Sequence, residues 1–215
     1  MNKKSKTELQ DPSVLWHTFQ RTHNLSEKQL HAFQHYAQLL IEWNEKFNIT
    51  AITDIREIIT LHFQDSLAIT GCIDLTRITG LADVGSGGGF PGIPIKIIQP
   101  DIFVLLIEVN QKKVQFLHEV IKALHLQNIE VVDFDWRTFI RKAHYPIDLF
   151  CARASLQIPE LLRIFKGDSP YQSSQLVYWA SRHYEPEPEH IPHVTRTCSY
   201  DLNGTERRLF VFGKQ

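Results

Sequence analysis

Five glycines lie between residues 85 and 92, directly after a strand-length run that ends at Val84. Because glycine has no Cβ, a ligand can approach the backbone of such a loop closely. The loop lies where a buried strand is expected to turn into a helix, which is the usual ligand-binding crevice of an open α/β sheet. A plain tight turn rarely needs five glycines, so we interpret this loop as a binding site.

Two acidic residues flank the loop. Asp83 comes just before it, where an acid can engage a positive charge, and Glu108 ends the next expected strand, 23 residues after Gly85. Glu108 could accept hydrogen bonds from the paired hydroxyls of a ribose. The alternative is that it is a solvated acid at a strand end without a ligand. A ligand with an amino acid end and an adenosine end would meet both acids and need no pyrophosphate cradle. These features favour S-adenosylmethionine.

The glycine pattern also leaves a dinucleotide cofactor open. The fingerprint G-x-G-x-x-G fails when read from Gly85, because Phe90 occupies its third glycine position. Read from Gly87 it fits, but it then starts late relative to the strand. A nicotinamide-dependent oxidoreductase is therefore the less favoured alternative.

His62 and Asp65 are three positions apart in a segment of helical character, so their side chains share one face. They can border a target base, or they can only join this helix to the rest of the fold. None of the eleven histidines has H-E-x-x-H spacing, and His190 with His193 lies in a proline-rich acidic loop, so we expect no metal site. Cys151 ends an apolar run and is predicted to be a buried small hydrophobe.

The elements that must position these residues alternate in character. Strand-length apolar runs predict strands over 78–84, 103–108, 129–132, 147–151 and 175–179, and helical segments are expected over 92–99, 111–126 and 159–165. Strands that alternate with helices predict an α/β fold with five parallel strands and right-handed crossovers. Runs over 194–200 and 208–212, with a turn at Asn203 and Gly204, predict a C-terminal antiparallel hairpin.

The first third of the chain is expected to be helical. Ser26 and Gln29 have the spacing of a capping box, and an apolar stripe follows through about Trp43. Asp54 can cap a second helix, and helical character continues to about residue 73. We therefore predict a helical extension over residues 1–73, packed on an α/β domain over residues 74–215.

Composition limits the function further. With 215 residues, 43% of them hydrophobic and 22% charged, the chain is expected to be globular. The net charge of −1 provides no global positive field for nucleic acid, so an RNA substrate would need a local patch. Three widely spaced cysteines predict a reducing, cytoplasmic compartment without disulfides, and no apolar stretch is long enough for a membrane span. The candidate patch residues are Lys3, Lys4, Lys6, Arg137, Arg141, Lys142, Arg207 and Arg208.

Five segments carry a resemblance to a known family: residues 48–51, 62–67, 83–94, 113–117 and 152–154. In these the chain is similar to the bacterial rRNA small subunit methyltransferase G proteins, also called glucose-inhibited division protein B. The resemblance implies a Rossmann-like class I methyltransferase fold, S-adenosylmethionine as donor, and methylation of a guanine N7 in the 16S rRNA of the small ribosomal subunit. A monomer is expected.

The resemblance also implies which residues contact the cofactor. They are Gly85, Phe90, Trp136, Arg137 and Arg153, beside the Asp83, Gly87 and Glu108 favoured above.

The chain departs from the family at two of these places. The family usually has a small or aliphatic residue followed by Glu where this chain has Trp136 and Arg137, and Asp135 can supply an acid instead. The family's Lys-Gly after the fifth strand is Ala180 and Ser181 here. These changes leave open a non-catalytic protein that binds RNA or the ribosome.

Overall fold

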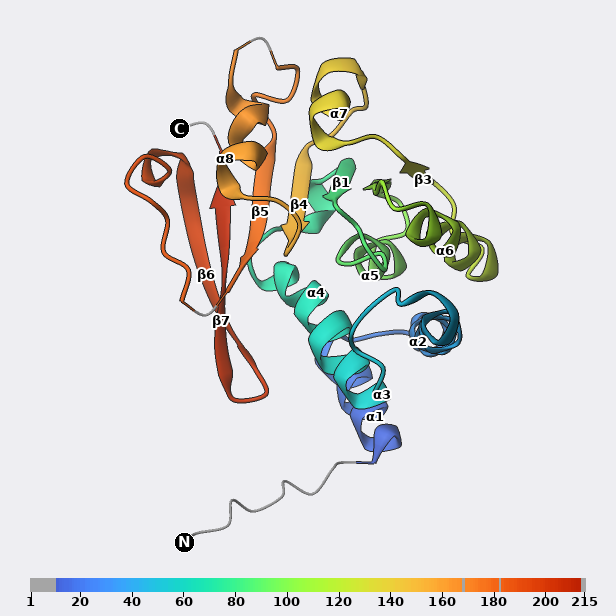
Figure 1. Ribbon diagram of the computed structural model, residues 1–215. Helices are drawn as coiled ribbons and strands as arrows, with labels where there is room; N and C mark the ends of the chain where they lie inside the picture. The colour runs from blue at the N-terminus through green and yellow to red at the C-terminus, as the bar shows by residue number, and fades with distance from the viewer. Residues whose placement is uncertain (1–10, 168, 182, 214–215) are drawn as a thin grey trace, which may run out of the picture.

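A computed structural model describes residues 11–167, 169–181 and 183–213, and its centre is one mixed sheet (Figure 1). The strand order is β3-β2-β1-β4-β5-β7-β6, with β1 to β5 parallel and β7 antiparallel to both of its neighbours. The predicted parallel strands and C-terminal hairpin are thus confirmed. The strands are β1 (Gly80–Val84), β2 (Phe103–Ile107), β3 (Ile129–Val132), β4 (Leu149–Arg153), β5 (Gln175–Ala180), β6 (Val194–Leu202) and β7 (Thr205–Phe212).

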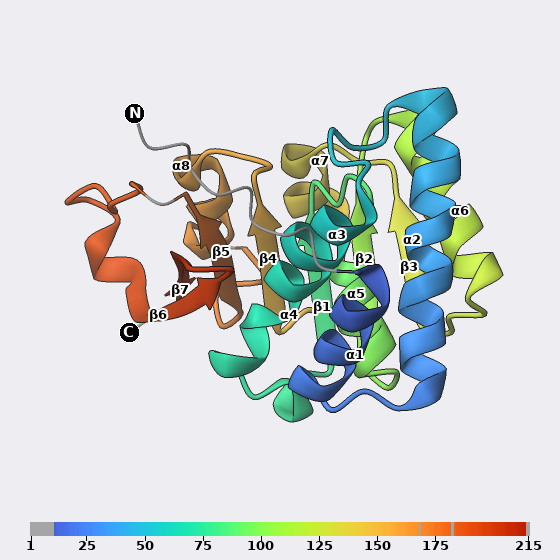
Figure 2. The same cartoon turned by 90° about the horizontal axis from the view of Figure 1, so that it is seen from below.

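Helices cover both faces of the sheet (Figure 2). Alternate residues point to opposite faces: Leu81 and Val104 join one buried cluster, Ala82 and Leu105 the other. The first face carries α5 (Gly92–Ile98), α6 (Gln111–Ala123) and the N-terminal helices, and the second carries α7 (Trp136–Lys142), α8 (Ile158–Leu161) and η4 (Leu162–Phe165). A short η5 (Ile191–His193) precedes β6. The sequence did not predict α7.

The N-terminal part is helical as expected. The helix α2 (Glu27–Phe47) begins with the predicted capping box, because Ser26 and Gln29 satisfy each other's backbone amides. Before it lies α1 (Pro12–Thr22), which falls inside the extension predicted to be helical but was not predicted as a separate helix. After it come α3 (Ile55–Glu57), the π-helix η1 (Ile58–Gln64), α4 (Asp65–Leu67), η2 (Ala68–Gly71) and η3 (Leu75–Arg77).

These helices share one buried cluster with the sheet, in which Phe33 and Leu40 join Leu81 and Val104. We propose that they are an extension that depends on the α/β part. None of the helices that the structure describes combines the length and the apolar character needed to cross a bilayer.

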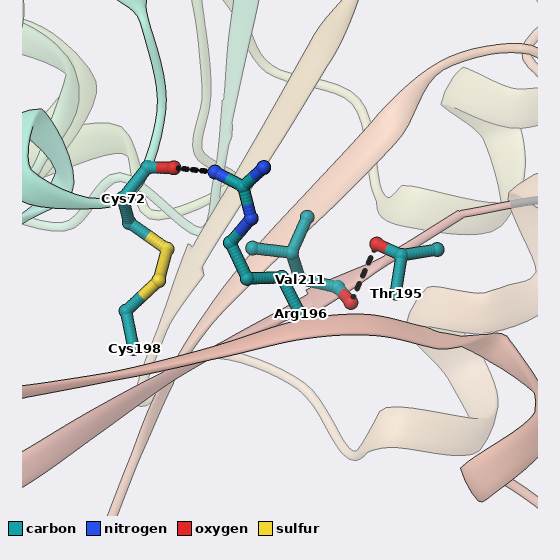
Figure 3. Close-up of a disulfide and its surroundings, with 5 residues drawn as sticks. All are labelled: Cys72, Thr195, Arg196, Cys198 and Val211. Atoms are coloured by element: carbon teal, nitrogen blue, oxygen red, sulfur yellow. Dashed lines mark hydrogen bonds between the residues drawn. A yellow bond between two sulfur atoms is a disulfide. The ribbon is translucent and has the colours of Figure 1, made fainter.

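One prediction from the sequence is wrong: Cys72 and Cys198 form a disulfide (Figure 3). The two cysteines are 126 positions apart, but β6 returns along the helical segment and brings their Cα atoms to 5.9 Å. Beside them the Arg196 guanidinium donates to the Cys72 carbonyl over 2.6 Å. Sequence spacing cannot reveal such a contact, because only the strand order creates it. Cys151 is free and fully buried, as expected for a small hydrophobe.

Candidate functional site

Two cavities meet at the carboxyl ends of β1, β2 and β4. The Glu108 cavity, about 350 Å³, is lined by Glu108, Phe134 and Trp136 among others. The Arg153 cavity, about 390 Å³, is lined by residues that include His62, Phe90 and Arg153. Both are also lined by Gly85, Gly87, Lys113 and Ala154, so the two cavities adjoin at the glycine loop.

The glycine loop needs its glycines for two reasons. Gly85 has φ +69°, and a Cβ there would lie 2.5 Å from Cβ of Ser155. The amides of Gly85 and Ser86 both donate to the Ile107 carbonyl, which binds the loop to the tip of β2. The loop backbone therefore lies between the two cavities, and its role as a binding loop stays a prediction.

The two acids have different surroundings. Glu108 lines its cavity and accepts from the Gly87 amide over 2.8 Å and from the amides of Val109 and Asn110 over 2.9 Å each. Asp83 is fully buried beneath the loop, where its Oδ2 accepts from the Gly92 amide and its Oδ1 has no hydrogen-bond partner among the described residues. Burial raises the pKa of Asp83 to about 7. Glu108 thus faces the cavity, whereas Asp83 supports the loop from below.

Of the pair at 136 and 137, only the first lines the Glu108 cavity. The Trp136 indole N–H donates to the Glu160 carbonyl over 2.7 Å, which fixes the ring as a wall. Arg137 pairs with the Glu160 carboxylate through two nitrogens, at 2.9 and 3.1 Å, and lines a different hollow. Asp135 lines the Glu108 cavity and caps α7 by accepting from the Thr138 amide.

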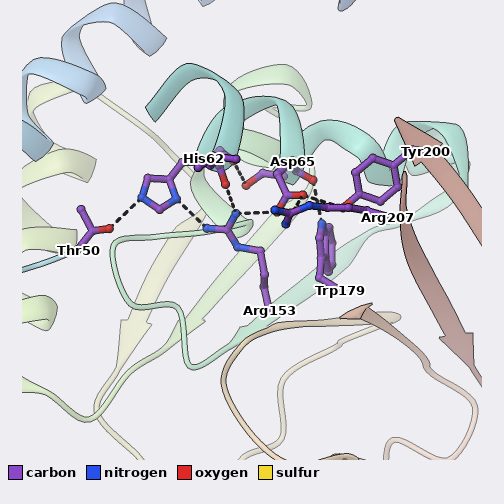
Figure 4. Close-up of polar contacts among 9 residues, drawn as sticks. Thr50, His62, Asp65, Arg153, Trp179, Tyr200 and Arg207 are labelled. Atoms are coloured by element: carbon purple, nitrogen blue, oxygen red, sulfur yellow. Dashed lines mark hydrogen bonds and ion pairs between the residues drawn. The ribbon is translucent and has the colours of Figure 1, made fainter. Parts of the chain in front are cut away.

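Arg153 joins the sheet to the N-terminal helices (Figure 4). Its Nη1 donates to the Leu61 carbonyl and to Oδ2 of Asp65, over 2.9 and 3.0 Å. Its Nη2 lies 3.2 Å from Nδ1 of His62. The guanidinium also lies over the Phe90 ring, 5.2 Å from its centroid. Three partners and an aromatic face therefore hold this cation at the tip of β4.

His62 is neutral in this arrangement. A guanidinium can only donate, so Nδ1 of His62 must accept, and the ring proton lies on Nε2, 2.9 Å from Oγ1 of Thr50. Burial and the nearby Arg153 charge lower the pKa of His62 to about 3. The ring stacks on Phe90 with centroids 4.2 Å apart. His62 thus has no free lone pair to take a proton from a substrate.

Asp65 is the point where four strands meet the helices, since β5, β6 and β7 contact it in addition to Arg153 of β4. Its Oδ1 accepts from the Tyr200 hydroxyl over 2.7 Å and pairs with Arg207 at 3.4 Å, while its carbonyl accepts from the Trp179 indole (Figure 4). The structure therefore brings His62, Asp65 and Arg153 together. The sequence did not assign Tyr200 and Trp179 to this site, because only the strand order places them there.

Other basic residues separate into groups. Arg207 lines the Arg153 cavity, whereas Arg208 pairs with Glu185 and donates to the Tyr184 carbonyl. Arg141 lines the same hollow as Arg137. Ala180 is buried at the end of β5. Lys3, Lys4 and Lys6 lie outside the described residues.

Residues 29–183 match the family described as rRNA small subunit methyltransferase G. The chain belongs to the rRNA small subunit methyltransferase G family. It is 32% identical over 212 residues to the member from Staphylococcus aureus strain Newman, covering 91% of this chain and 87% of that relative.

Two further members of the family match over a shorter stretch. The chain is 44% identical to the member from Desulfitobacterium hafniense, covering 64% of this chain and 57% of the relative. It is 41% identical to the member from Staphylococcus saprophyticus, covering 69% and 64%. The chain thus spans somewhat less than two thirds of the length of these two relatives.

Solved structures share the family's fold. A putative caffeoyl-CoA O-methyltransferase from Staphylococcus aureus aligns over 94% of this chain and all of that one, with a TM-score of 0.59 at 13% identity. TrmK from M. capricolum, solved with S-adenosyl-homocysteine, aligns over 73% of this chain and 70% of that one, with a TM-score of 0.53 at 16% identity. The fold is that of class I methyltransferases, as the sequence predicted.

Proposed function

We propose that this chain transfers a methyl group from S-adenosylmethionine to N7 of a guanine in the 16S rRNA of the small ribosomal subunit. The observation that carries this proposal is that the two cavities adjoin at the glycine loop and share four lining residues. One cavity has the acid and aromatic walls that suit an adenosine, and the other has a fixed cation and an opening for a base. The names of the family members support methyl transfer to the rRNA of the small subunit.

The residues present fit S-adenosylmethionine. A Cβ at Gly85 would collide with Ser155, so the loop leaves space that only glycine provides. Glu108 would hold the ribose hydroxyls, and Phe134 and Trp136 would flank the adenine. The partnerless Oδ1 of Asp83 adds negative charge beneath the loop when that carboxyl is ionised, which favours a cationic ligand.

Base-free transfer suits both the target and the side chains. The bound cofactor supplies a sulfonium methyl group. Guanine N7 carries a lone pair and no proton, so the enzyme needs to position the base and does not need to deprotonate it. The neutral, fully engaged His62 agrees with this assignment, and Arg153 can hold the cofactor carboxylate or an RNA phosphate.

The alternatives are separated by two measurements. S-adenosylmethionine, and not NAD, should raise the melting temperature, because a ligand that binds only the folded state stabilises it. Stabilisation by NAD alone would favour the oxidoreductase. Small subunits from cells that lack the protein should accept labelled methyl groups from the purified chain, and subunits from cells that contain it should accept none. If neither kind of subunit accepts methyl groups, the result would favour a non-catalytic protein that binds RNA or the ribosome.

The proposed substrate also suggests where the protein acts. Because the Cys72–Cys198 disulfide removes the inference from cysteine usage, a cytoplasmic location is proposed from the ribosomal substrate alone. We further propose that the chain acts as a monomer and without a metal ion. Sedimentation of the purified chain and activity in the presence of a chelator test these two points.

A further inference from the structure

The largest of these hollows lies outside the two cavities described above. It has a volume of about 690 Å³ and lies between α7 and the segment that follows α8. We refer to it as the basic groove. It is lined by Arg137, Ile140, Arg141, Arg163, Lys166 and Gly167.

The groove carries an excess of positive charge. Four of its six lining residues are cationic, and all four are exposed. Glu160 neutralises part of this charge, because it pairs with Arg137 at 2.9 Å and Arg163 at 3.4 Å. Among the described residues, no acid lies within ion-pair distance of Arg141 or Lys166. Because the whole chain has a net charge of −1, four cations in one hollow are a local concentration of positive charge.

The groove adjoins the Glu108 cavity. Consecutive residues at the start of α7 line the two hollows: Trp136 forms a wall of the cavity and Arg137 lines the groove. The pairing of Arg137 with Glu160 also joins α7 to α8 and fixes the guanidinium where it lines the groove. A chain of phosphates bound along the groove would therefore pass directly beside the site proposed for the cofactor.

We propose that the basic groove binds the phosphate backbone of the rRNA substrate, with Arg141 and Lys166 as its principal phosphate contacts. This inference rests on the proposed function. Exposed cations beside the apolar Ile140 suit phosphate contacts that carry no base sequence. The Nε of Arg141 donates to the Arg137 carbonyl over 3.3 Å, which leaves the other guanidinium nitrogens to meet a phosphate. A local patch of this kind is what a protein without net positive charge needs to hold an RNA.

The test compares two double variants of equal charge. Arg141→Gln with Lys166→Gln alters the groove, and Lys28→Gln with Lys122→Gln removes two exposed cations from α2 and α6. Filter binding to a full-length 16S rRNA transcript is measured at several KCl concentrations. Loss of two phosphate contacts should reduce the slope of log K against log[salt] by about 1.4 to 1.8, and the control should keep the wild-type slope.

Binding of S-adenosylmethionine, followed by calorimetry, should be the same in both double variants, which shows that the fold and the cofactor site are intact. Equal slopes and affinities for the groove variant and the control would overturn the proposal, and so would a wild-type chain that does not bind the transcript. Methyl transfer by the wild-type chain is measured separately. Groove-dependent binding without transfer would contradict the proposed function and leave the groove assignment standing.

Discussion

At the scale of single residues, Arg153 links the chemistry to the fold. It extends from the tip of β4 and is held by Leu61, His62 and Asp65, all from the segment that contains the π-helix η1. π-helical turns are frequent at functional sites. The wider turn changes which side chains share a face of the helix. Here the turn directs His62 and Asp65 toward the same guanidinium. The Arg153 guanidinium is therefore held in one position, beside the glycine loop and at the wall of the Arg153 cavity.

Replacement of Arg153 by Ala should lower kcat/KM for methyl transfer at least tenfold, about 1.4 kcal/mol of transition-state stabilisation. The loss follows from removing a cation that the proposed function places on the cofactor carboxylate or an RNA phosphate. Steady-state kinetics with small subunits measure it, with Arg77→Ala, an exposed arginine outside the site, as the control. Wild-type kinetics in a folded Arg153→Ala protein would remove Arg153 from the site.

Gly85→Ala should weaken binding of S-adenosylmethionine and destabilise the chain. The new Cβ would meet Ser155 at 2.5 Å, and the left-handed backbone conformation adds strain of about 1 to 3 kcal/mol. Gly71→Ala is the matched control, since a Cβ at Gly71 meets nothing within 4 Å. Calorimetric titration measures the affinity. If the two variants bind the cofactor equally well, the glycine loop is not the binding site.

The depressed pKa of His62 predicts how stability depends on pH. The unfolded chain binds a proton on this ring near pH 6.5, whereas the folded chain does so only at about pH 3. The contribution of His62 to the free energy of unfolding is therefore fully present above pH 6.5 and falls as the pH is lowered. At pH 5 the free energy of unfolding should be lower by about 2 kcal/mol than at neutral pH on account of this residue.

Urea unfolding of the wild type and of His62→Gln at each pH isolates this contribution. The difference is needed because Asp83, whose folded pKa is raised, changes stability in the opposite direction between about pH 4 and 7. A difference between wild type and variant that stays constant from pH 8 to pH 5 would show that folding leaves the pKa of His62 unchanged and would contradict the lowered value.

Residue types predicted part of the site and not all of it. The glycines and Glu108 could be proposed from their types, because their chemistry depends on their place after a strand. Phe90 was expected only from the family resemblance, and it lines the Arg153 cavity. Arg137 was assigned to the cofactor, but its side chain turns to Glu160, and only the packing of α7 on α8 decides that direction. Tyr200 and Trp179 reach Asp65 from strands far along the chain, which no local pattern indicates.

At the scale of elements, the hairpin of β6 and β7 is docked on the helical segment by several contacts, of which three lie on β6. The disulfide joins Cys198 to Cys72, Arg196 donates to the Cys72 carbonyl, and Tyr200 donates to Asp65 (Figures 3 and 4). Cys198 and Tyr200 are two positions apart on β6 and so point to the same side of the strand. The hairpin thereby supports the residue that positions Arg153.

Reduction of the disulfide should lower the free energy of unfolding by about 2 to 4 kcal/mol, because the bond restricts a long loop of the unfolded chain. Urea unfolding with and without a thiol reductant measures the effect. The double variant Cys72→Ser with Cys198→Ser should unfold at the same urea concentration under both conditions. If the urea midpoint of the wild-type chain is the same with and without the reductant, the disulfide does not form.

Most strands and helices were predictable, because each has its own apolar period and end signals. The five parallel strands, the hairpin and the capped α2 follow such patterns. The short helix α7 has too few turns to display a period, and α1 was not recognised before the first clear capping box. The disulfide depends on where β6 lies in the sheet, so it was beyond any reading of cysteine spacing.

At the scale of the whole molecule, the fold compensates for a charge that is unfavourable for RNA. The net charge is −1, yet Lys113, Arg153 and Arg207 line the Arg153 cavity, and the basic groove lies beyond the Glu108 cavity. The helices on one face of the sheet hold the cation, and those on the other face form the groove (Figure 2). Binding of the RNA and of the cofactor is therefore assigned to adjacent parts of one surface.

The central claim is methyl transfer to guanine N7. The most direct test is to incubate the purified chain with methyl-labelled S-adenosylmethionine and small subunits from cells that lack the protein, digest the rRNA, and identify the labelled nucleoside by mass spectrometry. We predict that the label is found in 7-methylguanosine at a single position. Label in an amine-methylated or C5-methylated nucleoside, or no label in the rRNA, would contradict the account.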